Sequence, residues 1–532
     1  MATTKQTALR WNLSERRVAE LCAAGCVPGA QKTGRVWAIP KDAQKPAGTR
    51  TLRRPFLSQT DRALLQRLRA LPPGYWDFKN SDTRELTHGI HSYPAVMVYP
   101  ISRSILSIVG SLRPVEALLD PFSGSGTVLV EGMLAGIPRI YGNDLNPLAQ
   151  LIGRVRTRLI PPEKLREACI RLFKSADKAY SLHADELGAV DSYIETVLGL
   201  DLSARSGWGD EAPKHLECFL KSRQSDLRIP SFKNIGYWYR PRVILELSLL
   251  RSCIREMPDG AERDFFWAAF SETARIVSNR RSGEFKMFRI PNEKINSYRP
   301  DTLSEFKKLV SQNCTKMNEM HTACPNGPCV FIGAENAAVL DGVPDESIDL
   351  MITSPPYGDS RTTVAYGEFS RLSLQWLELK DARAEEVSAL DRRLMGGQKY
   401  RGILQYDLGS PTLQEALLRI MEADSARAGD VFSFYQDLDS CIAAISSKMR
   451  PGGYQFWVVG NRTVKLQTLH TDVILAELAQ KYGLARLLTI DRNIPNKTMP
   501  LRNSPTNEAG KVVPTMTNEH IVVFKKLPRN EM

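Results

Sequence analysis

Two short loops, about 230 positions apart, constrain the fold of this 532-residue chain more than any other feature of its sequence. The first is Asp120-Pro-Phe-Ser-Gly-Ser-Gly-Thr127 and the second is Thr353-Ser-Pro-Pro-Tyr357. Each follows a short apolar run typical of a buried strand, so each is expected at the carboxyl end of a strand. Open α/β sheets bind their ligands at that edge. The sequence therefore predicts an α/β fold with a Rossmann-like sheet and a site to which both loops contribute.

The first loop has the features of a cofactor site lined by backbone. A helix is expected from Thr127 to Ala135, and Gly124 and Gly126 let the backbone before it approach a ligand closely. The amino end of that helix favours an anionic group. A strand over residues 139–141 then leads to Asp144, which is placed to bind the hydroxyl pair of a ribose.

The same loop excludes two common nucleotide sites. It lacks the Lys-Ser/Thr ending of a phosphate-binding P-loop, which argues against a nucleoside triphosphatase. It also lacks the third glycine of the dinucleotide fingerprint, which weakens a nicotinamide interpretation. A cofactor with a ribose and a carboxylate but no phosphate fits better, and S-adenosylmethionine is such a molecule.

The string from Asp120 to Thr127, with its acidic partner Asp144, resembles the first motif of the amino-group DNA methyltransferases. The upstream segment His91-Ser-Tyr-Pro-Ala95 resembles the stretch that folds over the cofactor in many of them. The resemblance implies that residues 122–127 line the methionine end of S-adenosylmethionine and that Asp144 binds its ribose. The cofactor-binding residues predicted in this way are Tyr93, Asp120, Phe122, Ser123, Gly124, Ser125, Gly126, Thr127 and Asp144.

The second loop has the chemistry that methylation of an exocyclic amine requires. Such an amine is a poor nucleophile because its lone pair is delocalised into the ring, and acceptors that bind its hydrogens favour a more pyramidal nitrogen. The Ser354 hydroxyl and the Pro355 carbonyl are candidate acceptors, and Pro355 and Pro356 stiffen the loop. Tyr357 offers a stacking face for a base turned out of the duplex. Ser354, Pro355, Pro356 and Tyr357 are the predicted catalytic residues.

A Ser/Asp/Asn-Pro-Pro-Tyr/Phe loop marks the amino methyltransferases, and the resemblance associates its serine form mostly with N4 of cytosine. N6 of adenine is the alternative target. An RNA amine methyltransferase and a DNA-binding regulator that no longer catalyses also remain open. The family resemblance further implies a restriction-modification system with a cognate endonuclease as a possible partner.

Two details near residue 330 qualify the resemblance. Relatives often carry an Asp directly after the glycine at position 333 to contact the adenine of the cofactor, but this chain has Ala334, so Glu335 or a backbone group is expected to substitute. Pro328-Cys329 and Glu335-Asn336 mimic signatures of ring-carbon cytosine methyltransferases in the wrong order. No catalytic cysteine is therefore assigned.

The first 46 residues predict a winged helix-turn-helix. Helices are expected over residues 4–11 and 14–24, the second with Val18, Leu21 and Cys22 on one face, followed by a hairpin that turns at residues 33–34. Residues 13–46 resemble the excisionase-like DNA-binding domains. The resemblance places Arg16, Arg17 or Glu20 in the major groove and Lys32 and Arg35 on phosphates. A small protein-contact domain is the alternative.

Charge supports a polyanionic partner, with double-stranded DNA preferred. The net charge is +12, and residues 1–70 hold 14 Lys/Arg against 4 Asp/Glu, a local excess of +10.

No apolar run approaches a membrane span, and the start lacks a signal-peptide core, so a cytoplasmic protein is expected. Nine scattered cysteines indicate reduced thiols. Cys314, His321, Cys324 and Cys329 lack the paired spacing of a zinc site, so no metal is predicted.

The spacing of the motifs predicts how the chain is divided. Asp144 and Ser354 are 210 positions apart, far more than a minimal fold needs, so a large, mostly helical insertion is expected between them. The expected divisions are a DNA-binding module over 1–46, a linker and helix over 47–79, the cofactor half over 80–160, the insertion over 161–325, and the catalytic half over 326–532 with a second insertion at about 382–429. Either insertion is a candidate for reading the bases.

Overall fold

The computed structural model describes residues 1–532 except 12–14, 16–17, 20–21, 23–26, 28–29, 34–35, 41–42, 44–56, 80, 282–285, 360–365, 378–383, 401–406, 495–501, 504–512, 515–517 and 532. The chain forms two compact units, residues 1–57 and 58–532. Each unit has its own hydrophobic core.

The smaller unit is built from a helix, further helical residues and a hairpin. Helix α1 spans Thr4–Trp11, and strands β1 (Gln31–Thr33) and β2 (Val36–Ala38) pair antiparallel with Thr33 opposite Val36. Between α1 and β1, residues Glu15, Val18, Ala19 and Cys22 are helical. Val18 and Cys22 are buried with Trp11 and Ile39, as their spacing predicted for one apolar face.

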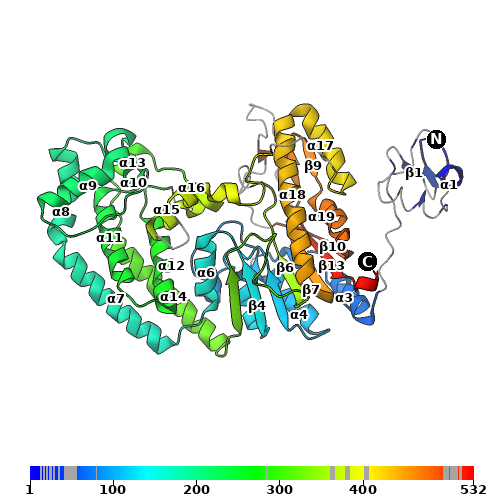
Figure 1. The fold of residues 1–532 in the computed structure, drawn as a ribbon, viewed down its shortest axis with the longest axis horizontal. Coiled ribbons are helices and arrows are strands. Elements are labelled where there is room, and N and C mark those ends of the chain that lie inside the picture. The colour runs from blue at the N-terminus through cyan, green and yellow to red at the C-terminus, as the bar shows by residue number, and fades with distance from the viewer. Residues whose placement is uncertain are drawn as a thin grey trace. The chain divides into compact units, whose positions relative to one another are not determined.

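A seven-stranded sheet organises the larger unit, in the order β10-β13-β7-β6-β3-β4-β5 (Figure 1). The five strands from β7 to β5 are parallel, whereas β13 is antiparallel to both β7 and β10. The strands are β3 Ala117–Asp120, β4 Arg139–Asn143, β5 Cys329–Gly333, β6 Ile348–Thr353, β7 Met449–Gly460, β10 Leu484–Asn493 and β13 Asn518–Lys526. This is the predicted α/β, Rossmann-like class of fold.

Alternating side chains of the strands face two helical layers. Leu119, Met351 and Trp457 pack on one face, beneath α17 (Pro411–Ala423), α18 (Ser425–Lys448) and α19 (Thr471–Gln480). Leu118, Leu350 and Phe456 pack on the other, against α3 (Gln59–Ala70), α4 (Tyr99–Gly110) and α5 (Thr127–Leu134). The period of two along each strand produces a three-layer sandwich.

Buried polar contacts fix α3 to the sheet. Ser58 and Asp61 form a capping box at the start of α3. The Asp61 carboxylate also accepts hydrogen bonds from Tyr454 Oη at 2.6 Å and from Lys525 Nζ at 2.6 Å. Because Asp61 is fully buried, these partners satisfy a charge that would otherwise be costly to bury.

A large helical lobe lies between β4 and β5 in sequence and beside the sheet in space (Figure 1). It has an extensive core of its own, which includes Trp208, Phe219, Tyr239, Phe266 and Phe270. Its helices are α7 Pro162–Leu182, α8 Ala184–Ser192, η3 Tyr193–Val197, η4 Arg205–Gly209, α9 Asp210–Ser222, α10 Ile235–Trp238, α11 Pro241–Arg255, α12 Ala261–Ile276, α13 Asn292–Ile295 and α14 Thr302–Ala323. Helix α6 (Pro147–Thr157) connects β4 to this lobe.

The region of the expected second insertion is divided between two cores. Leu390 of α16 (Ala384–Arg393) packs in the core of the helical lobe, where it joins Phe369, Leu372 and Trp376 of α15 (Tyr366–Leu377), the helix that precedes this region. Helix α17 instead packs with α18 and α19 over the sheet. The segment therefore contributes to both halves of the molecule.

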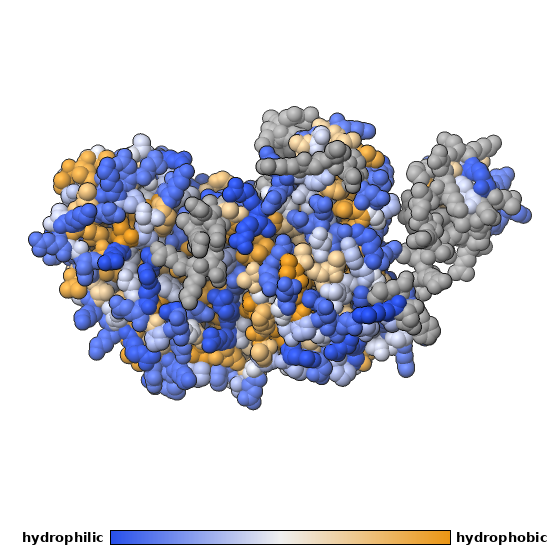
Figure 2. Space-filling model, in the orientation of Figure 1, coloured by the Kyte–Doolittle hydropathy of each residue, from blue (hydrophilic) through white to orange (hydrophobic). Residues whose placement is uncertain are grey.

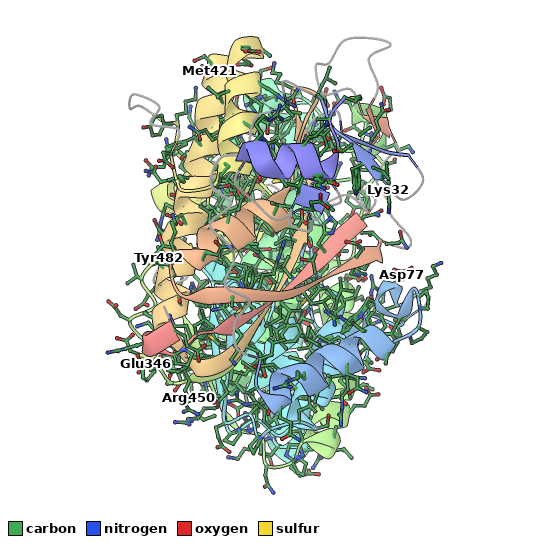
Figure 3. The ribbon with its side chains drawn as sticks, turned by 90° about the vertical axis from the view of Figure 1, so that its right-hand side faces the viewer. Lys32, Asp77, Glu346, Met421, Arg450 and Tyr482 are labelled. Carbon is green, nitrogen blue, oxygen red and sulfur yellow. The ribbon has the colours of Figure 1, made fainter. Side chains whose placement is uncertain are left out.

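The remaining short elements are η1 Tyr75–Asp77, η2 Leu86–Gly89, β8 Arg462–Val464, β9 Gln467–Leu469, β11 Arg502–Asn503, β12 Val513–Pro514 and η5 Arg529–Glu531. Asp77, labelled in Figure 3, accepts hydrogen bonds from the backbone and side-chain nitrogens of Asn493 and so joins η1 to the end of β10. The face seen in Figure 2 mixes hydrophilic and hydrophobic residues. Within the described residues, no helix has both the length and the apolar character that crossing a bilayer requires.

Candidate active site

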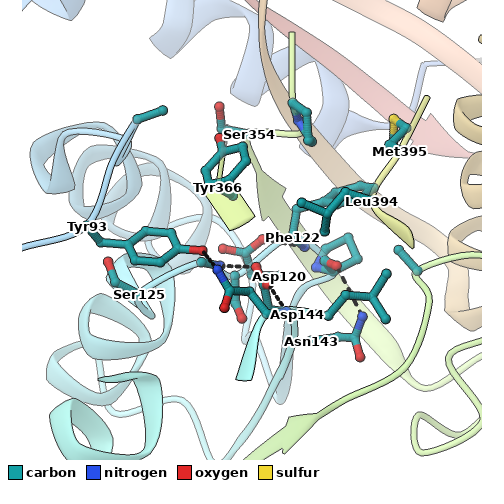
Figure 4. A pocket seen from close by; sticks show the side chains of 18 of the residues that line it. Tyr93, Asp120, Phe122, Ser125, Asn143, Asp144, Ser354, Tyr366, Leu394 and Met395 are labelled. Atoms are coloured by element: carbon teal, nitrogen blue, oxygen red, sulfur yellow. Dashed lines mark hydrogen bonds between the residues drawn. The ribbon is translucent and has the colours of Figure 1, made fainter. Parts of the chain in front are cut away.

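A cavity opens at the carboxyl ends of β3 and β6, where the order of the strands reverses direction (Figure 4). Such a reversal leaves a crevice between the two neighbouring loops. Both loops singled out in the sequence reach it. The predicted site residues that line the cavity are Tyr93, Asp120, Phe122, Ser123, Gly124, Ser125, Thr127, Asp144, Ser354 and Pro356. Gly126, Pro355 and Tyr357 are described by the structure but do not contribute to this lining.

The glycine loop turns sharply between β3 and α5. Gly126 has φ +84°, and a Cβ at this position would lie 3.2 Å from the Cα of Gly153 on α6. The Gly126 N–H donates to the Ser123 carbonyl at 2.8 Å, and the Ser123 N–H donates to the Asn143 carbonyl at 3.0 Å. The left-handed backbone and the close helix packing both require glycine at 126.

Asp144 directly follows β4 and faces the glycine loop. Its carboxylate accepts hydrogen bonds from the backbone N–H of Gly124 at 2.9 Å and of Asn146 at 2.8 Å. Burial raises the pKa of Asp144 to about 6, although these two bonds favour the charged form. A carboxylate has about four acceptor sites, so capacity remains for ligand hydroxyls.

Asp120 joins the two loops at the place between β3 and β6 where the strand order reverses. The Thr353 hydroxyl, at the end of β6, donates to Asp120 Oδ1 at 2.6 Å, and the Phe122 N–H donates to the same oxygen at 3.2 Å. Burial raises the pKa of Asp120 to about 7. Thr353 and Asp120 therefore fix the distance between the predicted cofactor loop and the predicted catalytic loop.

Tyr93 covers the glycine loop from the segment over residues 91–95. Its ring lies beside Gly124, where an added Cβ would lie 3.5 Å from Tyr93 Cε1. Its hydroxyl accepts a hydrogen bond from Asn146 Nδ2 at 3.0 Å, and the same nitrogen donates to Ser370 Oγ at 2.7 Å. Tyr366 stacks on Tyr93 with ring centroids 6.0 Å apart. Asn146, which caps the amino end of α6, and residues of α15 thus hold Tyr93 at the cavity (Figure 4).

Arg156 of α6 is a supporting residue that sequence reasoning missed. It donates to the carbonyls of Ile90 and His91 and to both the carbonyl and the hydroxyl of Ser125, at 2.8–3.1 Å. It is 3% exposed, and burial lowers its pKa to about 9. This guanidinium clamps the 90–91 segment to the glycine loop. An arginine in an amphipathic helix carries no sequence signal for such a role.

Asn143 positions the segment that includes the Ala334 departure. Its side-chain amide accepts from the Glu335 N–H at 3.0 Å and donates to the Glu335 carbonyl at 2.9 Å. Glu335 and Asn336 both line the cavity. The reciprocal bonds hold this backbone in a fixed position at the end of β5.

Ser354 and Tyr357 continue into a chain of hydrogen bonds. Ser354 Oγ donates to Tyr357 Oη at 3.2 Å, and Tyr357 Oη donates to Glu519 Oε1 at 2.9 Å. Glu519 also pairs with Arg492, the residue opposite it where β10 and β13 pair. Ser354 and Tyr357 are half-buried, and the Arg492 side chain is 4% exposed.

Of the residues predicted to contact DNA, Lys32 alone falls within the described part of the chain, and Glu20 lies outside it. It is exposed on β1 with its ammonium 5.9 Å from the centroid of Trp37 (Figure 3). Arg16, Arg17 and Arg35 lie outside the described residues.

The cysteines are dispersed. Cys314 of α14 faces Cys169 of α7 with 3.5 Å between the sulfurs, and Cys324 Sγ lies 3.5 Å from the Met133 carbonyl. Cys329 is exposed at the start of β5. Among the residues that the structure describes, no three His, Cys, Asp or Glu side chains converge as metal ligands would.

Comparison with known proteins assigns the family. No protein-family model matches the chain. Type II methyltransferase M.MvaI of Kocuria varians is 38% identical over 461 residues, which span 85% of this chain and 93% of that relative. Type II methyltransferase M.MjaII of Methanocaldococcus jannaschii is 28% identical over 218 residues, covering 36% and 40% of the two chains. The chain belongs to the type II methyltransferase family, and the methyltransferase resemblance drawn from the two loops is confirmed.

A search of solved structures adds an rRNA methyltransferase, aviRa from Streptomyces viridochromogenes. It is 10% identical and covers 82% of this chain and 88% of that one, with a TM-score of 0.24. At that score the likeness bears neither on the fold nor on the substrate.

Proposed function

We propose that this protein is an S-adenosylmethionine-dependent DNA methyltransferase that modifies the exocyclic amine of a base turned out of the duplex, with N4 of cytosine as the preferred target. The observation that carries this proposal is the shared cavity. The glycine loop, Asp144, Ser354 and Pro356 meet there, although their sequence positions are far apart. A donor site and an amine-binding turn must face the same space for methyl transfer.

The cavity suits S-adenosylmethionine by the chemistry of its walls. Asp144 offers carboxylate acceptors for ribose hydroxyls, and Gly124 adopts a left-handed backbone conformation (φ +49°) beside Tyr93 that glycine reaches readily. Arg393 is the one Lys or Arg residue among the described residues that line the cavity, which fits a cofactor without phosphates better than a nucleotide. When bound, S-adenosylmethionine supplies a methyl group activated by its sulfonium.

The acceptors for the target amine come from the second loop. Ser354 donates its own proton to Tyr357, so the oxygen lone pairs of Ser354 stay available at the cavity wall. The Pro355 carbonyl is the second candidate acceptor, and Pro355 and Pro356 stiffen the loop that presents it. Two acceptors at one nitrogen favour the pyramidal geometry in which its lone pair becomes reactive.

The serine at position 354 supports cytosine N4 as the target, by the resemblance of the Ser-Pro-Pro-Tyr loop. The basic amino-terminal unit supports duplex DNA as the substrate, with Lys32 exposed on its hairpin. Under this proposal the unit is a winged helix-turn-helix that contacts phosphates. Membership of a type II family supports a cognate restriction endonuclease as a functional partner in the same cell.

The test is incubation of unmethylated genomic DNA with labelled S-adenosylmethionine, followed by mass spectrometry of the nucleosides. N4-methylcytosine is expected from the wild type, with loss of product in Ser354→Ala. N6-methyladenine would preserve the mechanism and change the base. Folded protein that binds cofactor yet transfers no label to DNA would contradict the proposal, and label in total RNA would redirect it to RNA.

A further inference from the structure

The hydrogen-bond chain behind Ser354 has a fixed direction. An ionised carboxylate only accepts hydrogen bonds, so Tyr357 must donate to Glu519. The Tyr357 oxygen is then left as an acceptor, and Ser354 donates to it. Burial, together with the charge of Glu519, raises the pKa of Tyr357 well above its ordinary value, so its proton stays in place.

The direction matters because serine is chemically ambiguous. A hydroxyl both donates and accepts, and its hydrogen rotates to suit the partners available. An amine nitrogen that must keep its lone pair for the methyl group offers only hydrogens to the protein. A Ser354 proton turned toward the cavity would compete with those hydrogens and bind the lone pair instead.

We propose that Glu519, acting through Tyr357, sets the direction of the Ser354 hydroxyl so that its oxygen lone pairs, and not its proton, face the target amine. The inference rests on the proposed function. Glu519 is therefore a positioning residue and not a catalytic one, and Ser354 is the group that touches the substrate. Nothing in the sequence around Glu519 distinguishes it from an ordinary strand residue.

Arg492 gives the chain its anchor. It lies opposite Glu519 in the antiparallel pairing of β10 and β13, and it pairs with the Glu519 carboxylate, while its Nε donates to the Trp76 carbonyl at 2.8 Å. Because Arg492 only donates, it orients one carboxylate oxygen toward itself and leaves the other for Tyr357. The Glu519 side chain is 14% exposed, which limits competition from water.

Glu519→Gln is the informative substitution because it reverses the direction of the hydrogen bonds from Ser354 through Tyr357. Arg492 requires the amide oxygen, so the amide NH₂ faces Tyr357 and donates to it. Tyr357 must then donate to Ser354, and the hydroxyl hydrogen of Ser354 turns toward the cavity. We expect kcat to fall about 10- to 100-fold. The affinity for S-adenosylhomocysteine, measured by calorimetry, should stay within about twofold of wild type.

Tyr357→Phe keeps the aromatic ring and removes the hydroxyl that connects Ser354 to Glu519. Ser354 is then free to rotate, so a smaller loss of kcat is expected than in Glu519→Gln. The decisive test is the double variant, in which Glu519→Gln should cause no further loss in the Tyr357→Phe background. A residue with a merely structural role would give additive losses. Asp491→Asn, an exposed carboxylate one residue from Arg492, is the matched control and should retain full kcat.

Two results would overturn the inference: wild-type kcat in Glu519→Gln, or additive losses in the double variant. Thermal denaturation of each variant shows whether the fold is intact. If Glu519→Gln unfolds, wild-type kcat in Tyr357→Phe would overturn the inference instead. Absence of methylation by the wild type would instead contradict the proposed function. The two failures are therefore distinguishable.

Discussion

The two sides of the cavity are built by different means. On the β3–β4 side, backbone groups and a buried clamp define the wall: the Gly124 N–H contacts Asp144, and Arg156 ties Ser125 to the 90–91 segment. On the β6 side, the wall depends on a hydroxyl whose orientation is set by Tyr357 and Glu519. The first side presents a fixed shape, whereas the second presents a direction of hydrogen bonding. Binding should therefore depend on the first side and chemistry on the second.

Substitution of Ser354 is expected to separate the two sides of the cavity most clearly. Ser354→Ala should raise the barrier to methylation by about 3–4 kcal/mol, because it deletes an acceptor aligned with the reacting amine. The affinity for S-adenosylhomocysteine should stay within twofold of wild type. Single-turnover transfer and calorimetry measure the two quantities. A parallel loss of cofactor affinity would show that the two sides are not separable.

Arg156 tests whether the fixed side depends on its clamp. Arg156→Met should lower the free energy of unfolding by about 2–3 kcal/mol, since it leaves buried carbonyls of Ile90 and His91 without donors. Arg154→Met, on the same helix, is the control. Arg154 is 39% exposed and pairs with Asp264, so less than about 1 kcal/mol is expected. Urea denaturation compares them, and equal losses would remove the special role of Arg156.

Asp144 sharpens the comparison through pH. Its folded-state pKa of about 6 lies above the ordinary 3.8, so its ionised fraction falls as pH drops through about 6. Affinity for S-adenosylhomocysteine should rise between pH 5 and 7. Asp144→Asn should lose about 1–2 kcal/mol of binding free energy at pH 7 and flatten that rise. Any pH dependence of the affinity that remains in Asp144→Asn is attributed to Asp120, which lines the same cavity and has a pKa of about 7.

The same shift has a consequence for stability with the opposite sign. The folded protein without ligand holds the Asp144 proton more tightly than the unfolded chain does. The contribution of Asp144 to stability is thus complete below about pH 3.8 and is lost as pH rises through about 6. Asp144→Asn should remove this part of the pH dependence in thermal denaturation, and an unchanged profile would argue against a raised pKa.

The smallest effect is expected outside the cavity altogether. Lys32→Ala should weaken DNA binding by under about 1 kcal/mol at physiological salt and reduce the salt slope by about one unit. Lys5→Ala, exposed on α1 of the same unit, is the control because no phosphate contact is assigned to it. Fluorescence anisotropy over a salt series measures both. Identical slopes in the two variants would remove the assignment of Lys32.

The difference between the two sides also explains what the sequence could predict. Asp120 to Thr127 and Asp144 are local signals, because glycine at a tight turn and an acid after a strand are recognisable where they stand. The strand expected over residues 139–141 corresponds to β4 (Arg139–Asn143), and the apolar runs before the two loops correspond to β3 and β6. Glu519 carries no comparable local signal, because its role depends on pairing with residues far away in sequence.

Strand β10 lacks a clear sequence signal for a related reason. It lies at an edge of the sheet, most of its residues are half-exposed or exposed, and Arg486, Asp491 and Arg492 interrupt its apolar pattern. Edge strands often carry such charges, which obscure the period of two. Arg156 was missed because most of its partners are backbone carbonyls, which no side-chain pattern reveals.

The position of the helical lobe has an implication for how such a molecule can diversify. The chain passes from β4 through α6 before it enters the lobe, and it returns at β5, which pairs in parallel with β4 from Arg139 opposite Cys329 to Asn143 opposite Gly333. A Cβ on Gly327, just before β5, would lie 3.2 Å from Cδ1 of Leu159, just after α6. The points at which the chain enters and leaves the lobe are therefore adjacent. Lengthening, trimming or replacing the lobe need not shift that register, so its outer surface is free to vary while the cavity keeps its dimensions.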